Sequence, residues 1–303
     1  MSFFDTLREM LVILFAMAMG YLAHHLGYLG GETDQKLSKV ILNITMPAMI
    51  VAAVITGDTL PELSEVLAVL KVAAVFYLLE MLFALIAPRL LGGTPGQKGV
   101  WRFGLMFGNI AFIGYPVATA LFGPGALFYA VILAMPFNLL SYTLGPLMLV
   151  GVKRFQWKQL LTPCTVAAVL GLFFALTRLR PPAIVGECLS FVGNVTVPLS
   201  LLVVGSLLAG LPAGQVFKSP RLWCLSVLRL LALPGVLFVI LRALGTEPML
   251  LGITVVEMAM PVAVNGSMLC LEYGGNKECM AQATLLTTVA SIVTIPLIAS
   301  VLL

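Results

Sequence analysis

The sequence predicts an all-α polytopic membrane protein: ten transmembrane helices in two inverted five-helix repeats, with the fourth and ninth helices broken. Three observations predict this fold. The composition is too apolar for a soluble globule, ten apolar stretches have spanning length, and an internal repeat divides them five and five. Of the 303 residues, 60% are apolar and only 10% are charged, whereas soluble domains carry about 25% charged residues. The apolar excess runs from end to end, so no separate soluble domain is expected.

A transmembrane helix needs about 20 mostly apolar residues to cross the hydrocarbon core. Ten such stretches follow one another, separated by short turns that are charged or rich in glycine and proline. They lie at residues 7–29, 38–57, 66–88, 100–122, 126–150, 159–178, 187–210, 221–243, 248–271 and 279–303. The first is interpreted as a retained span, because it lacks the short apolar core and cleavage site of a signal peptide.

The distribution of basic residues predicts the orientation, because cytoplasmic loops are enriched in lysine and arginine. The turns after odd-numbered stretches hold eleven of them: Lys36, Lys39, Arg89, Lys98, Arg102, Lys153, Arg154, Lys158, Lys218, Arg221 and Lys277. The other side holds four: Arg8, Arg178, Arg180 and Arg242. This bias predicts a multi-pass protein of the cell (inner or plasma) membrane with both termini outside. The net charge of +4 mostly reflects the same bias, so no nucleic-acid partner is expected.

An internal repeat divides the chain into residues 1–152 and 153–303. The run Asn43–Pro47 matches Asn194–Pro198 at an offset of 151. At an offset of 150, Ser141 and Pro146-Leu147 match Ser291 and Pro296-Leu297. Five spans are an odd number, so the second repeat must enter the membrane upside down, which is typical of secondary transporters.

The fourth and ninth stretches carry polar residues and a proline at mid-depth, within Gly108–Pro116 and Val255–Gly266. Proline removes a backbone hydrogen bond, which is costly in hydrocarbon unless the gap lines a cavity in the protein. Two such breaks at equivalent places predict that the fourth and ninth helices unwind and cross near the midplane. Because proline is tolerated at the first position of a helix, we expect Pro116 and Pro261 each to open a second half-helix.

Two half-helix N-termini at mid-membrane predict an anion site, since each carries about +0.5 charge and unpaired N–H groups. A carboxylate substrate suits this field, and the amides of Asn109 and Asn265 can donate hydrogen bonds to it. The alternative is that both asparagines only cap the broken backbone. The candidate substrate-binding residues are Asn109, Gly114, Tyr115, Pro116, Met260, Pro261 and Asn265.

The carboxylate of Glu257 is unexpected in a span, where a charged side chain costs about 2–3 kcal/mol on insertion scales. The membrane interior holds one other acid, Glu80, and one clear cation, Arg229. Glu80 and Arg229 lie at near-equivalent places in the third and eighth stretches, so they can pair. Glu257 would then need a proton or Na⁺, which makes it the candidate ion-coupling residue. The alternative is that Arg229 pairs with Glu257, whose role would then be structural.

Five further polar residues are weaker candidates. Asn43 and Asn194 each precede a proline by four residues, and we expect their amides mainly to satisfy backbone carbonyls freed by those prolines. Substrate contact is the alternative for both. Asn138, Ser141 and Ser291 lie in the fifth and tenth stretches, where hydroxyls more often join helices. The five cysteines are scattered, so no metal site or disulfide is predicted, and no cofactor beyond a coupling ion.

The order of several motifs resembles the auxin efflux carrier family over nearly the whole chain. These motifs are Gly108-Asn109 with Phe112, Gly114 and Pro116, then Met260-Pro261 with Ala263, and Thr294-Ile295-Pro296-Leu297. The resemblance implies a scaffold domain of helices 1, 2, 6 and 7 and a mobile transport domain of helices 3–5 and 8–10. It also implies a homodimer with an elevator-like shift. The short link at residues 151–159 resembles bacterial permeases for malonate, malate and related acids, whereas plant auxin carriers have a long loop there.

Together these observations predict a secondary active transporter of small organic anions, either mono- or dicarboxylates, with H⁺ or Na⁺ as the candidate coupling ion. Its expected partners are the anion, the lipid bilayer and a second copy of the chain. The alternative is a channel or a transporter-like membrane sensor. Polar residues that cluster at mid-depth, rather than along several spans, favour the transporter. An enzyme is not expected, since the sequence lacks the His-Glu-x-x-His and Gly-x-Ser-x-Gly motifs and paired aspartates.

Overall fold

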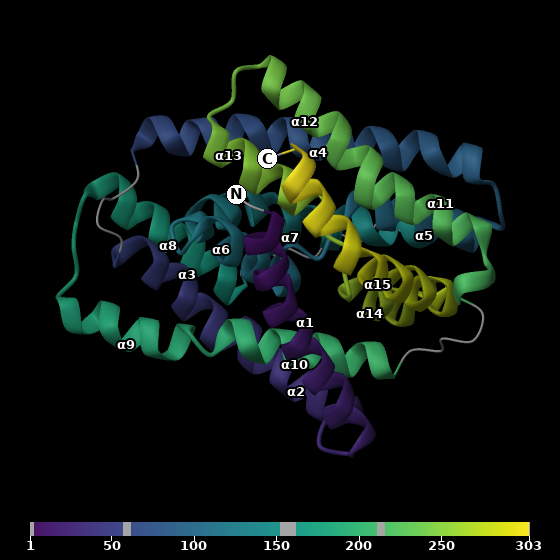
Figure 1. The fold of residues 1–303 in the computed structure, drawn as a ribbon, viewed down its shortest axis with the longest axis horizontal. Helices are drawn as coiled ribbons and strands as arrows, with labels where there is room; N and C mark the ends of the chain where they lie inside the picture. The colour runs from purple at the N-terminus through teal and green to yellow at the C-terminus, as the bar shows by residue number, and fades with distance from the viewer. Residues whose placement is uncertain (1–2, 57–61, 152–161, 211–215, 303) are drawn as a thin grey trace.

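The computed structural model describes residues 3–56, 62–151, 162–210 and 216–302. Within these ranges the chain is helical, with one isolated backbone bridge and no strand (Figure 1). The first half contains α1 (Phe3–His25), α2 (Gly31–Val40), η1 (Ile41–Thr45), α3 (Met46–Ile55), α4 (Leu63–Leu91), α5 (Pro95–Met106), η2 (Ile110–Gly114), α6 (Tyr115–Phe122) and α7 (Ala126–Val150).

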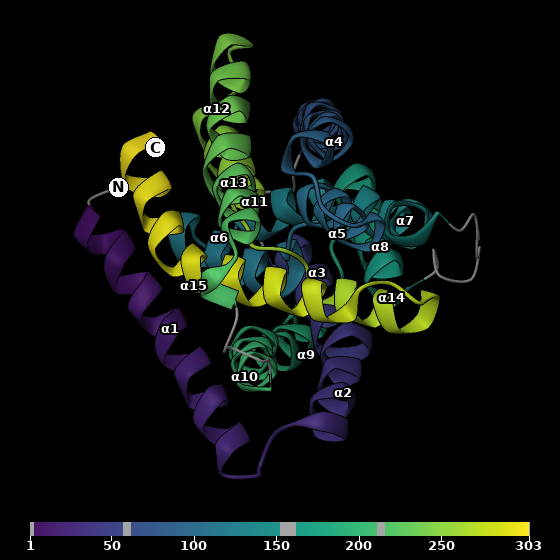
Figure 2. The ribbon, with the colours of Figure 1, turned by 90° about the vertical axis from the view of Figure 1, so that its right-hand side faces the viewer.

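The second half is also built of continuous and interrupted helices. It contains α8 (Pro163–Thr177), α9 (Ala183–Gly193), α10 (Thr196–Ala209), η4 (Val216–Lys218), α11 (Pro220–Val227), η5 (Leu228–Ala232), α12 (Leu233–Ala243), α13 (Pro248–Met258), α14 (Asn265–Tyr273) and α15 (Lys277–Leu302). The two ends of the chain lie near one another in both views, where the start of α1 approaches the end of α15 (Figures 1 and 2).

Several helices are long and apolar enough to cross a membrane. Among the described residues five pass this test, and a sixth does so if the bent α7 is one span: Gly31–Ile55, Leu63–Leu91, Ala183–Ala209, Pro220–Ala243, Lys277–Val301 and the bent pair within Ala126–Val150. Shorter apolar helices lie at Leu11–His25, Ile110–Phe122, Pro163–Thr177 and Pro248–Met258. The all-α polytopic class is therefore confirmed. The ten-span inverted repeat stays a prediction. Apart from Gly151, the link at 151–159, with Lys153, Arg154 and Lys158, lies outside the described residues.

Three π-helical turns mark where a proline interrupts a helix. η1, η2 and η5 each end two residues before a proline, at Pro47, Pro116 and Pro234. Proline lacks an N–H and crowds the carbonyl of the preceding turn, which a wider turn relieves. In each case the residue just before the proline donates its N–H to the carbonyl five residues back, as Tyr115 does to Ile110. The prolines thus bend these helices without ending them.

Glycines let α1 and α10 pack backbone to backbone. A β-carbon at Gly20 would overlap the backbone of Leu202, and one at Gly205 would overlap the backbone of Met17. Close approach through small residues is how transmembrane helices usually associate, because lipid offers no hydrophobic driving force. Helix α3 packs in turn against α8 and α9, so α1, α2–α3, α8 and α9–α10 are linked through contacts with one another (Figure 2).

Candidate functional site

Two interrupted helices cross in the buried interior. Three residues separate α5 from η2, and six residues separate α13 from α14. The two linking segments run antiparallel: the N–H of Asn109 donates to the carbonyl of Pro261 at 2.7 Å, and that of Ala263 to the carbonyl of Phe107 at 3.0 Å. Each break therefore satisfies backbone groups of the other, as an apolar environment requires. The predicted interruptions within residues 100–122 and 248–271, and the pairing of the two interrupted segments, are confirmed. Their places as the fourth and ninth of ten spans stay a prediction.

The prolines agree with the prediction only in part, because Pro116 lies in the first turn of α6 but Pro261 does not begin a helix. Helical backbone resumes at Ile110, six residues before Pro116, because the π-turn η2 continues directly into α6. Pro261 lies inside the unwound segment, and α14 begins four residues later at Asn265. The expectation fails because proline only forbids one N–H bond, whereas the start of each half-helix depends on which backbone groups the opposite segment satisfies.

Arg229 joins the crossing to α4 from a fully buried position on η5. Its Nε donates to the carbonyl of Met260 at 3.0 Å, and its Nη1 donates to the carbonyl of Leu105 at 3.1 Å and to Oε1 of Glu80 at 2.7 Å. The first two acceptors lie at or just beyond the C-terminal ends of α13 and α5, which carry partial negative charge. The arginine thus neutralises a carboxylate and two helix ends. The predicted Glu80–Arg229 pair is confirmed.

Two glycines between α5 and α6, Gly108 and Gly114, each leave room for a charged side chain. A β-carbon at Gly108 would overlap Nη2 of Arg229, and one at Gly114 would overlap Oε2 of Glu257. Both glycines have neighbours on the second half of the chain, so only the tertiary structure reveals their role. Gly114 was a candidate site residue, and it forms the surface against which the Glu257 carboxylate lies.

Glu257 has no compensating partner among the described residues. Its side chain is fully buried, and neither carboxylate oxygen accepts a hydrogen bond there. Since Arg229 is engaged by Glu80, the alternative pairing of Arg229 with Glu257 is excluded in this conformation. An isolated buried carboxylate is unfavourable unless a proton or a cation neutralises it.

The two candidate asparagines differ in their surroundings. Asn109 is buried and caps the start of η2, where its Oδ1 accepts the N–H of Phe112 at 3.3 Å. Its Nδ2 has no partner in the described part of the chain, so one side of the amide is structural and the other is open. Asn265 is half-buried at the first position of α14, and its Oδ1 is likewise open. Tyr115 and Met260 are both buried beside the crossing.

The five weaker candidates lie on several different helices. Asn43 and Asn194 lie on the surface beside the breaks in α2–α3 and α9–α10. The Asn43 amide donates to the carbonyl of Lys39 at 2.7 Å, so it is structural, although the carbonyl it serves is not the one that Pro47 frees. Asn138 and Ser141 lie on α7, and Ser141 is buried.

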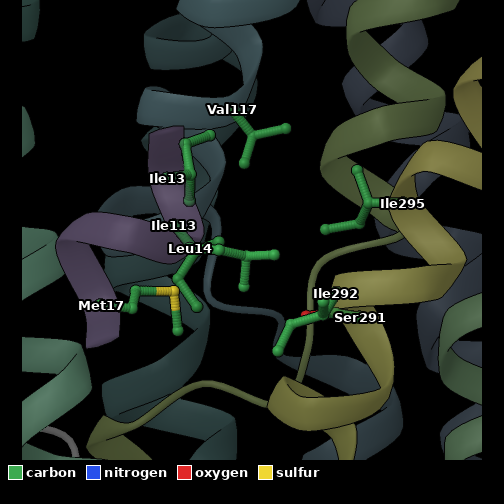
Figure 3. A pocket seen from close by; sticks show the side chains of 8 residues that line it. All are labelled: Ile13, Leu14, Met17, Ile113, Val117, Ser291, Ile292 and Ile295. Atoms are coloured by element: carbon green, nitrogen blue, oxygen red, sulfur yellow. The ribbon is translucent and has the colours of Figure 1, made fainter. Parts of the chain in front are cut away.

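Ser291, the last of these candidates, lines a small cavity between α1, the η2–α6 segment and α15 (Figure 3). The other side chains around the cavity are apolar: Ile13, Leu14, Met17, Ile113, Val117, Ile292 and Ile295. The hydroxyl of Ser291 donates to the carbonyl of Thr288 within its own helix at 2.7 Å. An apolar cavity of this kind does not hold a carboxylate. The cavity therefore does not suit the anion that the sequence predicts.

One residue of the site gave no signal in the sequence. The hydroxyl of Thr287 on α15 accepts the N–H of Val262 at 3.1 Å while it donates to the carbonyl of Ala283 at 2.7 Å. It therefore ties α15 to the unwound segment. Hydroxyls are common in spans, so nothing in the spacing distinguishes this one.

The described residues also hold no group of three or more His, Cys, Asp or Glu side chains suited to a metal ion.

The comparisons with known proteins decide the family. A family model described as "Membrane transport protein" matches residues 5–154 and 146–299, which together cover almost the whole chain. The chain belongs to this family. It is the auxin efflux carrier family that the sequence resembles, a family of membrane transporters and not of enzymes.

Three relatives of this transporter extend over nearly its full length. A protein of Methanothermobacter thermautotrophicus named "Uncharacterized transporter" is 26% identical and covers 98% of both chains. One of Methanocaldococcus jannaschii with the same description is 24% identical over 95% of this chain and 96% of its own. The "Putative malonate transporter" of Rhizobium meliloti is 22% identical over 91% of this chain and 89% of its own.

Proposed function

We propose that this membrane transporter is a secondary active carrier of small organic anions, either mono- or dicarboxylates. The observation that carries the proposal is the crossing of two interrupted helices with polar groups left open beside it. Among the described residues these open groups include Nδ2 of Asn109 and both carboxylate oxygens of Glu257. Buried polar groups in native proteins are nearly always satisfied. Polar groups without partners at a helix break therefore favour a binding site, in which a ligand and an ion supply the missing interactions.

An anion suits the crossing because the site offers donors without a free cation. The positive charge of Arg229 is balanced by Glu80 and by two helix ends. The first N–H groups of η2 have no partner within their own helix and carry partial positive charge. Together with the Asn109 amide, these donors can bind one carboxylate group. A donor site of low net charge also lets the unloaded carrier move through an apolar environment at modest cost.

Glu257 is our candidate for the coupling ion, H⁺ or Na⁺. It lies against Gly114, a few residues from the Asn109 cap, so the ion and the anion would bind close together. A bound proton or sodium ion would remove the repulsion between the carboxylate and an anionic substrate. Binding of each would then favour binding of the other, which is the requirement for coupled transport.

The wider architecture that we propose is ten spans in two inverted repeats, with elevator-type alternating access in a homodimer. The contacts support a separate scaffold domain, because its helices pack mainly with one another: α1, α2–α3, α8 and α9–α10. These are the segments assigned to the scaffold. Both interrupted helices pack against α7 and α15, which belong to the proposed mobile domain. An even number of spans also agrees with chain ends that lie close together (Figure 2).

A thermal-shift screen with purified protein tests the anion proposal. The panel contains acetate, butyrate, malonate and malate, each with and without Na⁺ and at two pH values, because a ligand stabilises the state that binds it by mass action. The name of the Rhizobium relative makes malonate the first acid to test. We expect at least one acid to raise the melting temperature, and ion-driven uptake of that acid into proteoliposomes. If no acid shifts the melting temperature under any condition, the organic-anion proposal is wrong.

A further inference from the structure

Two threonine hydroxyls occupy equivalent places in the repeat and are buried without partners. The motif Asn-x-Thr-x-Pro occurs at Asn43–Pro47 and again at Asn194–Pro198. Its threonines, Thr45 and Thr196, are 6% and 1% exposed, so both are more than nine-tenths buried. Neither Oγ1 has a hydrogen-bond partner in the part of the chain that the structure describes. The asparagines of the motif lie on the surface, so the threonines are its inward-facing polar members.

Buried threonine hydroxyls without a partner are a minority in the described helices: besides Thr45 and Thr196 they are those of Thr284 and Thr294 on α15. A threonine in a span normally donates to the carbonyl of the preceding turn. Seven threonines among the described residues do so: Thr56, Thr119, Thr143, Thr177, Thr254, Thr287 and Thr288. Thr45 ends the π-turn η1, and Thr196 begins α10 just after a break, so both stand where the regular helix is interrupted. The breaks therefore present two hydroxyls that the backbone does not use.

Both threonines share a helix face with members of one apolar cluster that extends to the crossing. Thr45 shares a helix face with Ile41 and Met49, one turn before and after it. Both belong to the apolar cluster that also contains Ile110 and Ile113 of η2. This cluster therefore includes residues of the turn that Asn109 caps.

Thr196 shares its face with Ser200 and Val203, of which Val203 belongs to the same cluster. Helix α10 also contacts both η1 and η2. Thr196 thus lies on a helix that contacts η2, and Thr45 lies on a turn that contacts the same helix. The open amide of Asn109 lies at the start of η2.

We propose that Thr45 and Thr196 are the scaffold's contacts to the transported anion, an inference that rests on the proposed function. A hydroxyl can donate one hydrogen bond to a carboxylate oxygen without adding charge. Two such donors, one from each repeat, would bind the anion from the scaffold while the Asn109 amide binds it from the crossing. The inference replaces Asn43 and Asn194 with Thr45 and Thr196 as the scaffold residues of the site.

The test compares Thr45→Val, Thr196→Val and the double variant with the wild type. Valine keeps the shape of threonine and removes the hydroxyl. Each variant is titrated with the acid of the panel that stabilises the wild type most, and the Kd is taken from the thermal shift and from uptake. We expect each single variant to weaken binding about tenfold and the double variant more, since a hydrogen bond to a charged group is lost each time. Without the acid, the melting temperature should stay equal or rise, because an unsatisfied buried hydroxyl is removed.

Ser200→Ala is the matched control. Ser200 is buried one turn after Thr196, but its hydroxyl donates to the carbonyl of Val197 at 2.9 Å. We expect this variant to bind the acid like the wild type. If the double threonine variant also binds like the wild type, the inference is wrong while the proposed function stands. If no acid stabilises the wild type, the proposed function fails and this inference fails with it.

Discussion

Gly114 and Glu257 lie in direct contact across the helix crossing, although they belong to opposite halves of the chain. The backbone of Gly114 is ordinary helix, with φ −61° and ψ −52°, so any residue could adopt it. Glycine is needed there for space alone, because a β-carbon would overlap the Glu257 carboxylate. The contact places the Glu257 carboxylate within about one turn of the break between α5 and η2.

The first prediction is that Gly114→Ala destabilises the protein and stops transport. Alanine normally favours a helix over glycine, but here the added methyl group overpacks the crossing, which costs about 1–3 kcal/mol. The melting temperature in detergent and uptake into proteoliposomes measure the two effects. Gly235→Ala on α12 is the control, because a β-carbon there meets no atom within 4 Å. Adding Glu257→Ala to Gly114→Ala should restore stability, and a failure to do so would contradict the contact.

The second prediction concerns ion coupling. Glu257→Gln keeps the shape of the side chain and removes its charge, so it should abolish ion-driven accumulation. Exchange of substrate across the membrane, which needs no ion gradient, should continue. The melting temperature should stay equal or rise, because an unpartnered buried carboxylate is lost. Glu272→Gln, on the surface of α14, is the control. Unchanged accumulation in Glu257→Gln would exclude this residue from coupling.

The third prediction is that Arg229→Met is among the most destabilising single substitutions in the chain. It leaves Glu80 and the carbonyls of Met260 and Leu105 without their donor, and breaking a buried ion pair costs about 3–5 kcal/mol. The double variant Glu80→Gln/Arg229→Met should lose less than the sum of the single losses, because the two residues interact directly. Chemical denaturation in detergent measures these differences.

The exposed pair Lys36–Glu32, at 3.2 Å on α2, is the control for the buried pair. Lys36→Met should change the free energy of unfolding by less than about 0.5 kcal/mol, because surface pairs contribute little. Additive losses in the Glu80/Arg229 cycle would contradict the coupling that their 2.7 Å contact implies.

The fourth prediction separates the two roles of Asn109. Asn109→Asp retains an oxygen that can accept the N–H of Phe112, so the cap and the stability should survive. It replaces the open Nδ2 with an acceptor, so binding of a carboxylate should fall by more than tenfold. Asn109→Ala should lose the cap as well, at about 0.5–2 kcal/mol. If Asn109→Asp transports normally, the asparagine is only a cap.

Much of the crossing was predictable because the repeat aligns its parts. The near-equivalent places of Glu80 and Arg229 correctly predicted their pairing. The recurrence of polar residues and prolines in the fourth and ninth stretches correctly predicted two broken helices that cross. The role of Pro261 was predicted wrongly, since it lies in the unwound segment, and Pro116 lies in the first turn of α6 but follows a π-turn. A proline marks where one hydrogen bond is missing but not where the neighbouring segment supplies replacements.

The sequence by itself determined the membrane class, the helical fold and the positions of the broken helices. These features depend on hydropathy and proline chemistry, which act over one or two helical turns. Only the tertiary structure decided which side chains meet. It placed Gly108 against Arg229 and Gly114 against Glu257, and it turned Thr45 and Thr196 inward in place of their asparagine neighbours. The physical reason is that packing against segments far away in the chain decides which side of a helix is buried.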